Sequence, residues 1–519
     1  MPTDYFTLES NQPFSKSLIW QLNRDFYHES GILAWSNDIV PHHMTSNSKV
    51  GKTYAELIFG FLKDVATKKK SDEIVYMLEM GAGHGRLAFH ILSHLEKLLN
   101  NTKSKTAKYC YVLSDIVEDN LTFFDDHVQL QGYFRRGVLD TAYFNASESQ
   151  EIVLRKSQMT INPGALKQPI LAIANYFFDS IANDLFYIEN RIISACSVSI
   201  QSKEDPKEAT AEERIKSMEI SYQKKEQSTP FYDDQVLNEL LEDYRNILKK
   251  SYLFFPEKAI KCIQQLRNFS QQGLILLTMD KGYHEARDIM NKPEPDIVTH
   301  GSFSLWVNYH AFNLYCENQG GKALFPSFSN FNLDIGCLIF LPKSDTYTET
   351  SAAYEQFVNN FGPDDFNSIK RMAYFNIGRL KLTELIALYR LSAYDATFFI
   401  KLLPRLKHLA KTISFNERKR IAQTLHRVWE FYFNINEPLD LAYELGGLFY
   451  DLGFYSEALT HFQHSVDSFG TKADTFYNQA LCHYQLKEDI LFYKALNSGK
   501  VAFPEYARFG ELEKLDMSC

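Results

Sequence analysis

The sequence predicts an α/β domain built on a parallel sheet, followed by an all-α domain. Between residues 74 and 178, short apolar runs alternate with helical patterns. This alternation is typical of a parallel sheet that helices cover on both faces. Beyond Pro342 the strand patterns fade and the chain shows pairs of helices.

The expected elements follow in order along the chain. Residues 1–70 should form a mostly helical extension of the α/β domain, and residues 346–519 the helical domain. The strands of residues 71–345 are expected at 74–80, 108–115, 133–140, 169–178, 273–283 and 331–342. A charged, core-poor stretch indicates an insertion at about 200–255, beginning with a solvated loop or a helix. The polar segment 343–352 is the expected linker.

Composition excludes several classes of protein. A net charge of −9 argues against binding to nucleic acid or to an anionic membrane surface. No apolar run approaches the ~20 residues of a membrane span, and the start of the chain lacks a secretory signal. The 7 cysteines include no CxxC pair, which favours reduced thiols and a cytoplasmic protein. His42 and His43, like His461 and His464, lack partners at metal-binding spacing, so we expect no metal.

The stretch "VYMLEMGAGHGRLAFHIL" places a glycine loop, Gly81-Ala82-Gly83-His84-Gly85, between a strand and a helix. A helix N-terminus there offers free N–H groups to a nucleotide-like ligand. The phosphate-binding P-loop is excluded because no Lys-Ser/Thr pair follows. The dinucleotide fingerprint GxGxxG needs its third glycine one residue later, although a nicotinamide oxidoreductase stays an alternative.

With Glu79, this loop reads ExGxGxG and resembles motif I of class I S-adenosylmethionine (SAM) methyltransferases. The resemblance implies a Rossmann-like seven-stranded sheet and SAM as cofactor. The backbone at Gly81, Ala82, Gly83 and Gly85 would approach the methionine half of SAM. Glu79 would lie near its ammonium group or orient the loop.

Two acidic residues extend that resemblance. Asp115 ends the second expected strand, where a carboxylate can accept both ribose hydroxyls, and a helix N-cap is its alternative role. Asp140 ends the third expected strand. The resemblance implies contact with the adenine amino group there, and a plain turn residue is the alternative.

The fourth strand ends in "ANYFFDSI", for which there are two readings. Asn175 to Phe178 partly match the [DN]PP[YF] motif of amino-methylating enzymes, without its prolines. The segment also resembles "NEFFDALP" of the MidA-like methyltransferases, the family of the mitochondrial complex I assembly-factor arginine methyltransferase. "GLILLTMDKGY" is similar to that family's late strand ending in "DYG". This resemblance spans about residues 25–342, but Tyr176 and Lys281 replace the family's Glu and Tyr, so the substrate does not carry over.

The resemblance implies an acceptor site at the end of the fourth strand. Asn175 would bind the target amine and also border the cofactor. Carboxylates localise a guanidinium, and Asp179 is the candidate for an arginine acceptor. Its alternative role is to cap the following helix. Asn175 and Asp179 are thus the expected catalytic residues.

The helical domain contains an internal repeat, clearest at residues 440–505. Leu445, Gly446, Phe449, Ala458 and Phe462 stand where the tetratricopeptide pattern requires Leu, Gly, an aromatic, Ala and Phe. Ala480 lies one ~34-residue repeat after Gly446, and Pro504 closes the second unit. Phe492 replaces its expected Ala, so this second unit is degenerate.

These patterns favour a SAM-dependent methyltransferase that modifies a protein, at arginine, with the helical repeats docking the substrate or a partner. One alternative is a methyltransferase-like interaction scaffold with little or no activity. Another is methylation of a small molecule, with the repeats serving a homodimer.

Overall fold

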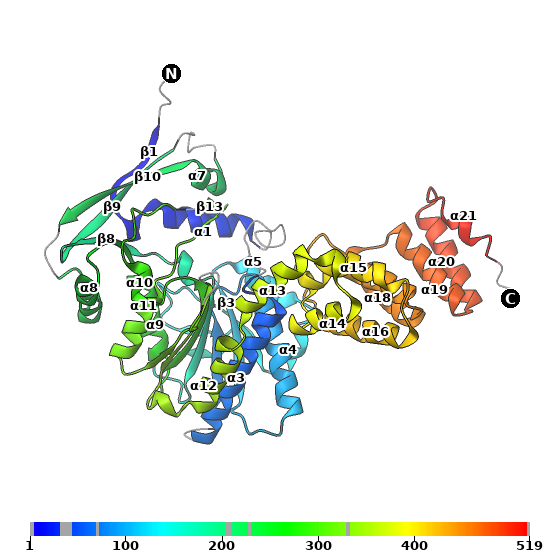
Figure 1. Ribbon diagram of the computed structural model, residues 1–519, viewed down its shortest axis with the longest axis horizontal. Coiled ribbons are helices and arrows are strands. Elements are labelled where there is room, and N and C mark those ends of the chain that lie inside the picture. Colours follow the sequence, from blue (N-terminus) through cyan, green and yellow to red (C-terminus); the bar gives the residue numbers. More distant parts are fainter. Residues whose placement is uncertain are drawn as a thin grey trace. The chain divides into compact units, whose positions relative to one another are not determined.

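The computed structural model describes residues 5–31, 44–68, 72–202, 209–226, 230–297, 299–300, 302–328 and 333–515 (Figure 1). Its contacts divide the chain into two compact units, Met1–Asn367 and Ser368–Cys519. Within the described part, no helix is both long enough and apolar enough to cross a membrane.

The first unit is built on a seven-stranded sheet in the order β15-β16-β12-β7-β2-β3-β4. The strands are β2 (Val75–Glu79), β3 (Tyr109–Asp115), β4 (Leu139–Tyr143), β7 (Ile170–Asn175), β12 (Leu274–Lys281), β15 (Lys322–Leu324) and β16 (Leu333–Phe340). Strands β12, β7, β2, β3 and β4 are parallel, whereas β16 is antiparallel to both β12 and β15. The predicted α/β domain is confirmed, and five of the seven strands in its sheet are parallel.

Helices cover both faces of this sheet (Figure 1). Alternate residues of β7, Ile170, Ala172 and Ala174, pack into one core with the helices α8 (Gln235–Ile247), α9 (Glu257–Asn268) and α11 (Tyr309–Asn318). Helices α3 (Ser48–Lys68), α4 (Arg86–Asn101) and α12 (Thr348–Tyr354) lie on the other side. Apolar residues on both faces explain the almost continuous apolar run of β7.

A second, antiparallel sheet, which the sequence does not predict, takes one strand from the N-terminal extension, whose described part is otherwise mostly helical. It contains β1 (Phe6–Pro13), β8 (Asp184–Glu189), β9 (Ile192–Ser202), β10 (Met218–Glu226) and β11 (Lys250–Phe255). The expected loop or helix of the insertion contains α7 (Ala211–Ser217) but continues into β10. Strands β1 and β10 are polar and mostly exposed, and both pair with β9. Their strand conformation therefore depends on a distant partner, which a local pattern does not reveal.

Helix α1 (Leu18–Ser30) packs on this sheet through Ile19 and Trp20, in a core that also holds Leu185 and Val198. Figure 1 shows α1 between the antiparallel sheet and the strand ends of the parallel sheet. Its N-terminus is capped by Glu9, which accepts hydrogen bonds from the Ser17 hydroxyl and, at 2.7 Å, from the Leu18 N–H.

The shorter elements of the first unit connect these layers. They are η1 (Phe14–Lys16), α5 (Glu118–Asp126), α6 (Gln131–Arg135), β5 (Ile152–Val153), β6 (Thr160–Ile161), η2 (Phe178–Ser180), α10 (Ala286–Ile289), β13 (Thr299–His300), β14 (Ser302–Phe303), η3 (Ser344–Thr346) and η4 (Glu355–Asn359).

The polar segment 343–352 is not a linker, because it contains η3 and the start of α12. The buried Asp64 carboxylate of α3 accepts hydrogen bonds from the Thr350 N–H at 2.9 Å and the Thr350 hydroxyl at 2.8 Å. Asp64 thus fixes α12 against α3, and the first compact unit extends to Asn367 rather than residue 345.

The second unit is entirely helical in its described part. After α13 (Pro363–Phe375) come η5 (Ile377–Arg379), α14 (Leu382–Leu391), α15 (Ala396–Ala410), α16 (Phe415–Glu430), α17 (Leu441–Asp451), α18 (Tyr455–Phe469), α19 (Ala473–Gln485), α20 (Asp489–Ala502) and α21 (Phe509–Leu512). Gly446 lets α17 approach α18, since a Cβ there would lie 2.7 Å from the Phe462 ring. The expected all-helical region is confirmed, whereas its tetratricopeptide character stays a prediction.

Close packing of α3 against α4 generates a first test. A Cβ on Gly51 of α3 would lie 2.3 Å from the His90 Cβ of α4, closer than two carbon atoms can approach. Gly51→Ala should therefore separate the helices and destabilise the first unit by about 1–3 kcal/mol. Urea unfolding followed by circular dichroism should show a lower midpoint. Gly132→Ala, in helix α6 with no atom nearer than 3.6 Å, is the control, and equal midpoints would contradict the expected clash.

Candidate functional site

A cavity of about 610 Å³ lies at the carboxyl ends of the parallel strands. Its floor includes residues 81–84 of the loop that joins β2 to α4. The Met80 N–H donates to the Ile173 carbonyl of β7, and the Ala82 N–H donates to the Ser114 carbonyl of β3, each at 2.9 Å. The loop is therefore attached to the strands on both sides of β2.

Positive φ angles occur at all three glycines of the loop. Gly81 and Gly83 both have φ near +59°, which other residues adopt only with strain. A Cβ on Gly81 would also lie 3.0 Å from the Phe177 ring. Gly81, Ala82 and Gly83 line the cavity. Gly85 is the N-cap of α4 and lies outside the cavity wall described here, so its role is to begin the helix.

Glu79, the last residue of β2, is a buried carboxyl that borders the cavity. Its Oε2 accepts a hydrogen bond from the Tyr111 hydroxyl at 2.7 Å. Burial raises the pKa of Glu79 to about 8, although the Tyr111 bond acts in the opposite direction. The site thus holds a carboxyl group that a nearby cation would readily ionise.

Asp115, the last residue of β3, connects the glycine loop to the neighbouring strand. Its Oδ2 accepts the Gly83 N–H at 2.9 Å, and its Oδ1 accepts the Val117 N–H at 3.0 Å. Burial raises the pKa of Asp115, while these N–H bonds lower it. Asp115 borders the cavity and is not the N-cap of α5, which is Val117.

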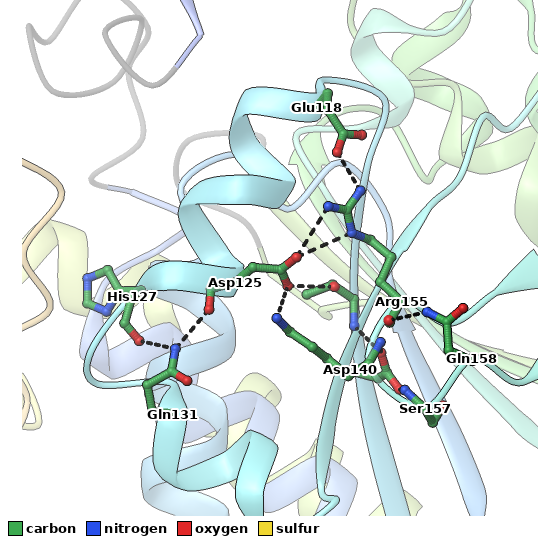
Figure 2. Close-up of polar contacts among 10 residues, drawn as sticks. Glu118, Asp125, His127, Gln131, Asp140, Arg155, Ser157 and Gln158 are labelled. Carbon is green, nitrogen blue, oxygen red and sulfur yellow. Dashed lines mark hydrogen bonds and ion pairs between the residues drawn. The ribbon is translucent and has the colours of Figure 1, made fainter.

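The expected strand end at Asp140 is wrong. Strand β4 continues to Tyr143, and residues 131–135 form helix α6 rather than the start of a strand. Asp140 accepts the N–H groups of Thr141 and Lys156 at 2.8 Å and of Ser157 at 3.0 Å (Figure 2). It holds the turn before β6 and is absent from the cavity wall, which instead includes residues 144–148 after the true end of β4.

Figure 2 also shows how this turn is tied to α5. The Arg155 guanidinium binds Glu118 at 2.5 Å and Asp125 at 3.3 Å, and the Lys156 ammonium binds Asp125 at 3.1 Å. The carboxylates of α5 thereby keep the turn beside the helix that follows Asp115.

Asn175, the last residue of β7, lines the cavity beside the glycine loop. Its Oδ1 accepts the Tyr54 hydroxyl of α3 at 2.6 Å, and its Nδ2 donates to the Thr45 carbonyl at 3.2 Å. Tyr176 follows with φ of +46°, an uncommon conformation for a large side chain. Tyr176 and Phe177 continue the wall.

Asp179 is not among the residues that line the cavity. It lies beside Asp280, which ends the buried part of β12, and the Asp179 N–H donates to Asp280 Oδ2 at 3.2 Å. Burial raises the pKa of Asp179 to about 7. Burial and the neighbouring Asp179 charge raise the pKa of Asp280 well above its usual range. The two carboxyls therefore form a pair behind the wall.

Sequence reasoning missed the wall opposite the strand ends. Residues of η1 and α1 form most of it, and Lys258 of α9 adds to it. The missed residues include Ser15, Lys16, Ser17, Trp20, Gln21, Asn23, Arg24 and Tyr27. No local pattern could place them there, because the pairing of β1 with β9 brings this segment over the parallel sheet.

Within the described ranges, no group of three or more His, Cys, Asp or Glu side chains is arranged to hold a metal. His42 and His43 lie outside these ranges. His461 is buried against Phe449 and Trp429, at ring-centroid distances of 5.0 and 5.1 Å.

Residues 61–301, a little under half of the chain, match a protein family described as "Putative S-adenosyl-L-methionine-dependent methyltransferase". The chain is accordingly a SAM-dependent methyltransferase, and SAM is its cofactor. No curated protein matches the chain.

Two solved structures from Burkholderia thailandensis are similar at a low level. An uncharacterised superfamily protein has 13% identity and a TM-score of 0.35, covering 61% of this chain and 73% of its own. A superfamily member bound to S-adenosyl-homocysteine has 14% identity and a TM-score of 0.37, covering 66% of this chain and 83% of its own. With TM-scores this low, neither structure bears on the fold or chemistry of this chain.

The raised pKa of Glu79 generates a second test. Because its folded pKa of about 8 exceeds its usual 4.5, its contribution to stability is complete below pH 4.5 and is lost as the pH rises towards 8. Relative to Glu79→Gln, the wild type should lose on the order of 3 kcal/mol of unfolding free energy between pH 5 and pH 7.5. Urea unfolding at both pH values measures this loss. Exposed Glu73→Gln is the control, and parallel curves for Glu79→Gln and wild type would refute the shift.

Proposed function

We propose that the chain transfers the methyl group of SAM to an arginine side chain of a protein substrate. The observation that supports this proposal most directly is the continuity of the cavity. It extends without interruption from the glycine loop to the segment after β7, where residues 175–177 and 180–182 line it. The cofactor and a methyl acceptor can thus share one enclosed space.

The residues of the loop suit SAM. Gly81 and Gly83 allow a close backbone approach, and Glu79 offers a carboxyl for the ammonium of the cofactor. Each Asp115 oxygen already accepts one N–H but keeps a further lone pair, which suits ribose hydroxyls. In this proposal Glu79, Gly81, Ala82, Gly83 and Asp115 hold the cofactor, Asn175 borders it, and Gly85 supports the loop. Asp140 has no part in binding.

A cationic acceptor suits the wall beyond the loop. Trp20, Tyr27, Tyr176 and Phe177 all line the cavity, and aromatic faces attract a guanidinium through cation–π interactions. Asp179 and Asp280 lie behind this wall, so any negative charge on the pair favours the same guanidinium. SAM supplies an activated methyl group, and the protein has to align the acceptor nitrogen with it. Asn175, held by Tyr54 and Thr45, would fix the acceptor nitrogen. Asp179 would attract the guanidinium through its charge, from behind the wall.

The helical pairs of the second unit are proposed to dock the substrate protein or a partner. Buried small residues such as Ala458 and Ala480 let neighbouring helices approach, which is how tetratricopeptide stacks form concave peptide-binding surfaces. We place the enzyme in the cytoplasm, where the six described cysteines, all free thiols, would stay reduced.

Calorimetric titration with SAM tests the cofactor assignment. Asp115→Ala should weaken binding at least about tenfold, because it removes a charge-assisted contact and releases Gly83. Gly83→Arg should abolish binding. Asp140→Asn, a buried aspartate away from the cavity, should keep its Kd within about threefold of wild type. Equal losses for Asp115→Ala and Asp140→Asn would contradict the assignment.

Incubation with methyl-labelled SAM and a protein lysate tests the reaction. We expect label on a protein band and methylarginine after hydrolysis, with Asn175→Ala lowering transfer at least about tenfold because the acceptor is no longer fixed. Exposed Asn246→Ala, on α8 away from the cavity, is the matched control. Label only in the low-mass fraction would favour a small-molecule acceptor. SAM binding without any labelled product would favour the interaction scaffold.

A further inference from the structure

Two lysines line the cavity near Asp184, because Ser15, next to Lys16, donates to Asp184, and Phe255, three residues before Lys258, pairs with Asp184. Lys16, from η1, is exposed, and Lys258, in the first turn of α9, is half-buried. Neither forms an ion pair with a carboxylate in the described part of the chain.

The topology assigns this part of the cavity to the acceptor rather than to the cofactor. The cofactor residues follow β2 and β3, whereas β7 lies on the opposite side of β2. Beyond the end of β7, Ile181 and Ala182 line the cavity and lead into β8. The Ser15 hydroxyl, next to Lys16, donates to Asp184 at the start of β8. Lys16 therefore lies past β7, on the side away from β3 and β4.

Nearby carboxylates already have partners of their own. Asp184 accepts hydroxyls from Ser15 and, at 2.6 Å, from Tyr232. Glu257, the neighbour of Lys258, is paired with Lys261 at 2.5 Å. Glu9 caps α1. The positive charge of the two lysines is thus left for a group that enters the cavity.

We propose that Lys16 and Lys258 bind a carboxylate of the substrate protein, so that the enzyme selects arginines flanked by acidic residues. This inference rests on the proposed function and names its substrate class. The aromatic side chains of the cavity wall would bind the guanidinium, and the two lysines would bind the carboxylate of the neighbouring acidic residue at the cavity mouth. The opposite charges of substrate and site would also fix the direction in which the peptide lies.

Peptide binding tests this inference separately from catalysis. The probes are fluorescein-labelled peptides with a central arginine, flanked on both sides by glutamate, glutamine or lysine. They are titrated with the full chain saturated with S-adenosyl-homocysteine and followed by fluorescence anisotropy. The glutamate peptide should bind about tenfold more tightly than the glutamine peptide, and less so at high salt. In the double variant Lys16→Glu, Lys258→Glu the order should reverse in favour of the lysine peptide.

Lys249→Glu, an exposed lysine outside the cavity wall, makes the same change of charge and should keep the wild-type order. The inference is overturned if the wild type binds the lysine peptide as well as the glutamate peptide, if the double variant keeps the wild-type order, or if no peptide binds. Methyl transfer to the same peptides is scored independently. Equal transfer to all three peptides would leave the proposed function intact and remove the selectivity. Binding in the expected charge order without methyl transfer would support the selectivity and contradict the proposed function.

Discussion

The hydrogen bond from the Gly83 N–H to the buried Asp115 carboxylate is the contact on which the site depends most. Strands β2 and β3 are neighbours through their backbone pairing, which ends at Glu79; beyond it the Ala82 N–H still donates to the Ser114 carbonyl. Asp115 adds a side-chain contact at this point, because one carboxylate oxygen accepts the Gly83 N–H. Its second oxygen accepts the Val117 N–H and so fixes the start of the following helix. The Asp115 side chain and the Ser114 carbonyl together hold the glycine loop against β3.

A buried carboxyl can do this only if its N–H bonds offset the cost of leaving water. Glu79 shows the alternative outcome, because in the described part of the chain its carboxyl accepts the Tyr111 hydroxyl and no backbone N–H, so burial prevails and raises its pKa. The site therefore combines a carboxylate held by backbone donors with a carboxyl whose ionisation a nearby cation would promote. This difference fits a cofactor that carries both hydroxyl groups and an ammonium group.

The cavity floor could be predicted from the sequence because its residues are close in the chain. Glu79, Gly81 and Gly83 follow one strand, and Asp115 and Asn175 end two others, so parallel strands bring them to one edge. The sequence misplaces Asp140, because the segment 133–140 predicts a strand that ends at the carboxylate, whereas the strand continues through Thr141 and Ala142. The opposite wall could not be predicted, since α1 reaches it only through pairing of β1 with a strand nearly 190 residues away.

The segment after β7 shows how the two carboxyls behind the wall contribute without touching the cavity. Tyr176 has a positive φ, which costs a non-glycine residue on the order of 1 kcal/mol. Its N–H donates to the Met279 carbonyl at 3.0 Å, and three residues later the Asp179 N–H donates to Asp280. Strand β12 therefore holds the strained turn at both ends. Because Asp280 is completely buried, water does not compete for its acceptor oxygen, and the hydrogen bond from the Asp179 N–H is retained. The turn is thereby kept in the conformation that presents Tyr176 and Phe177 to the cavity, and this accounts for a buried acid that lies outside the cavity wall.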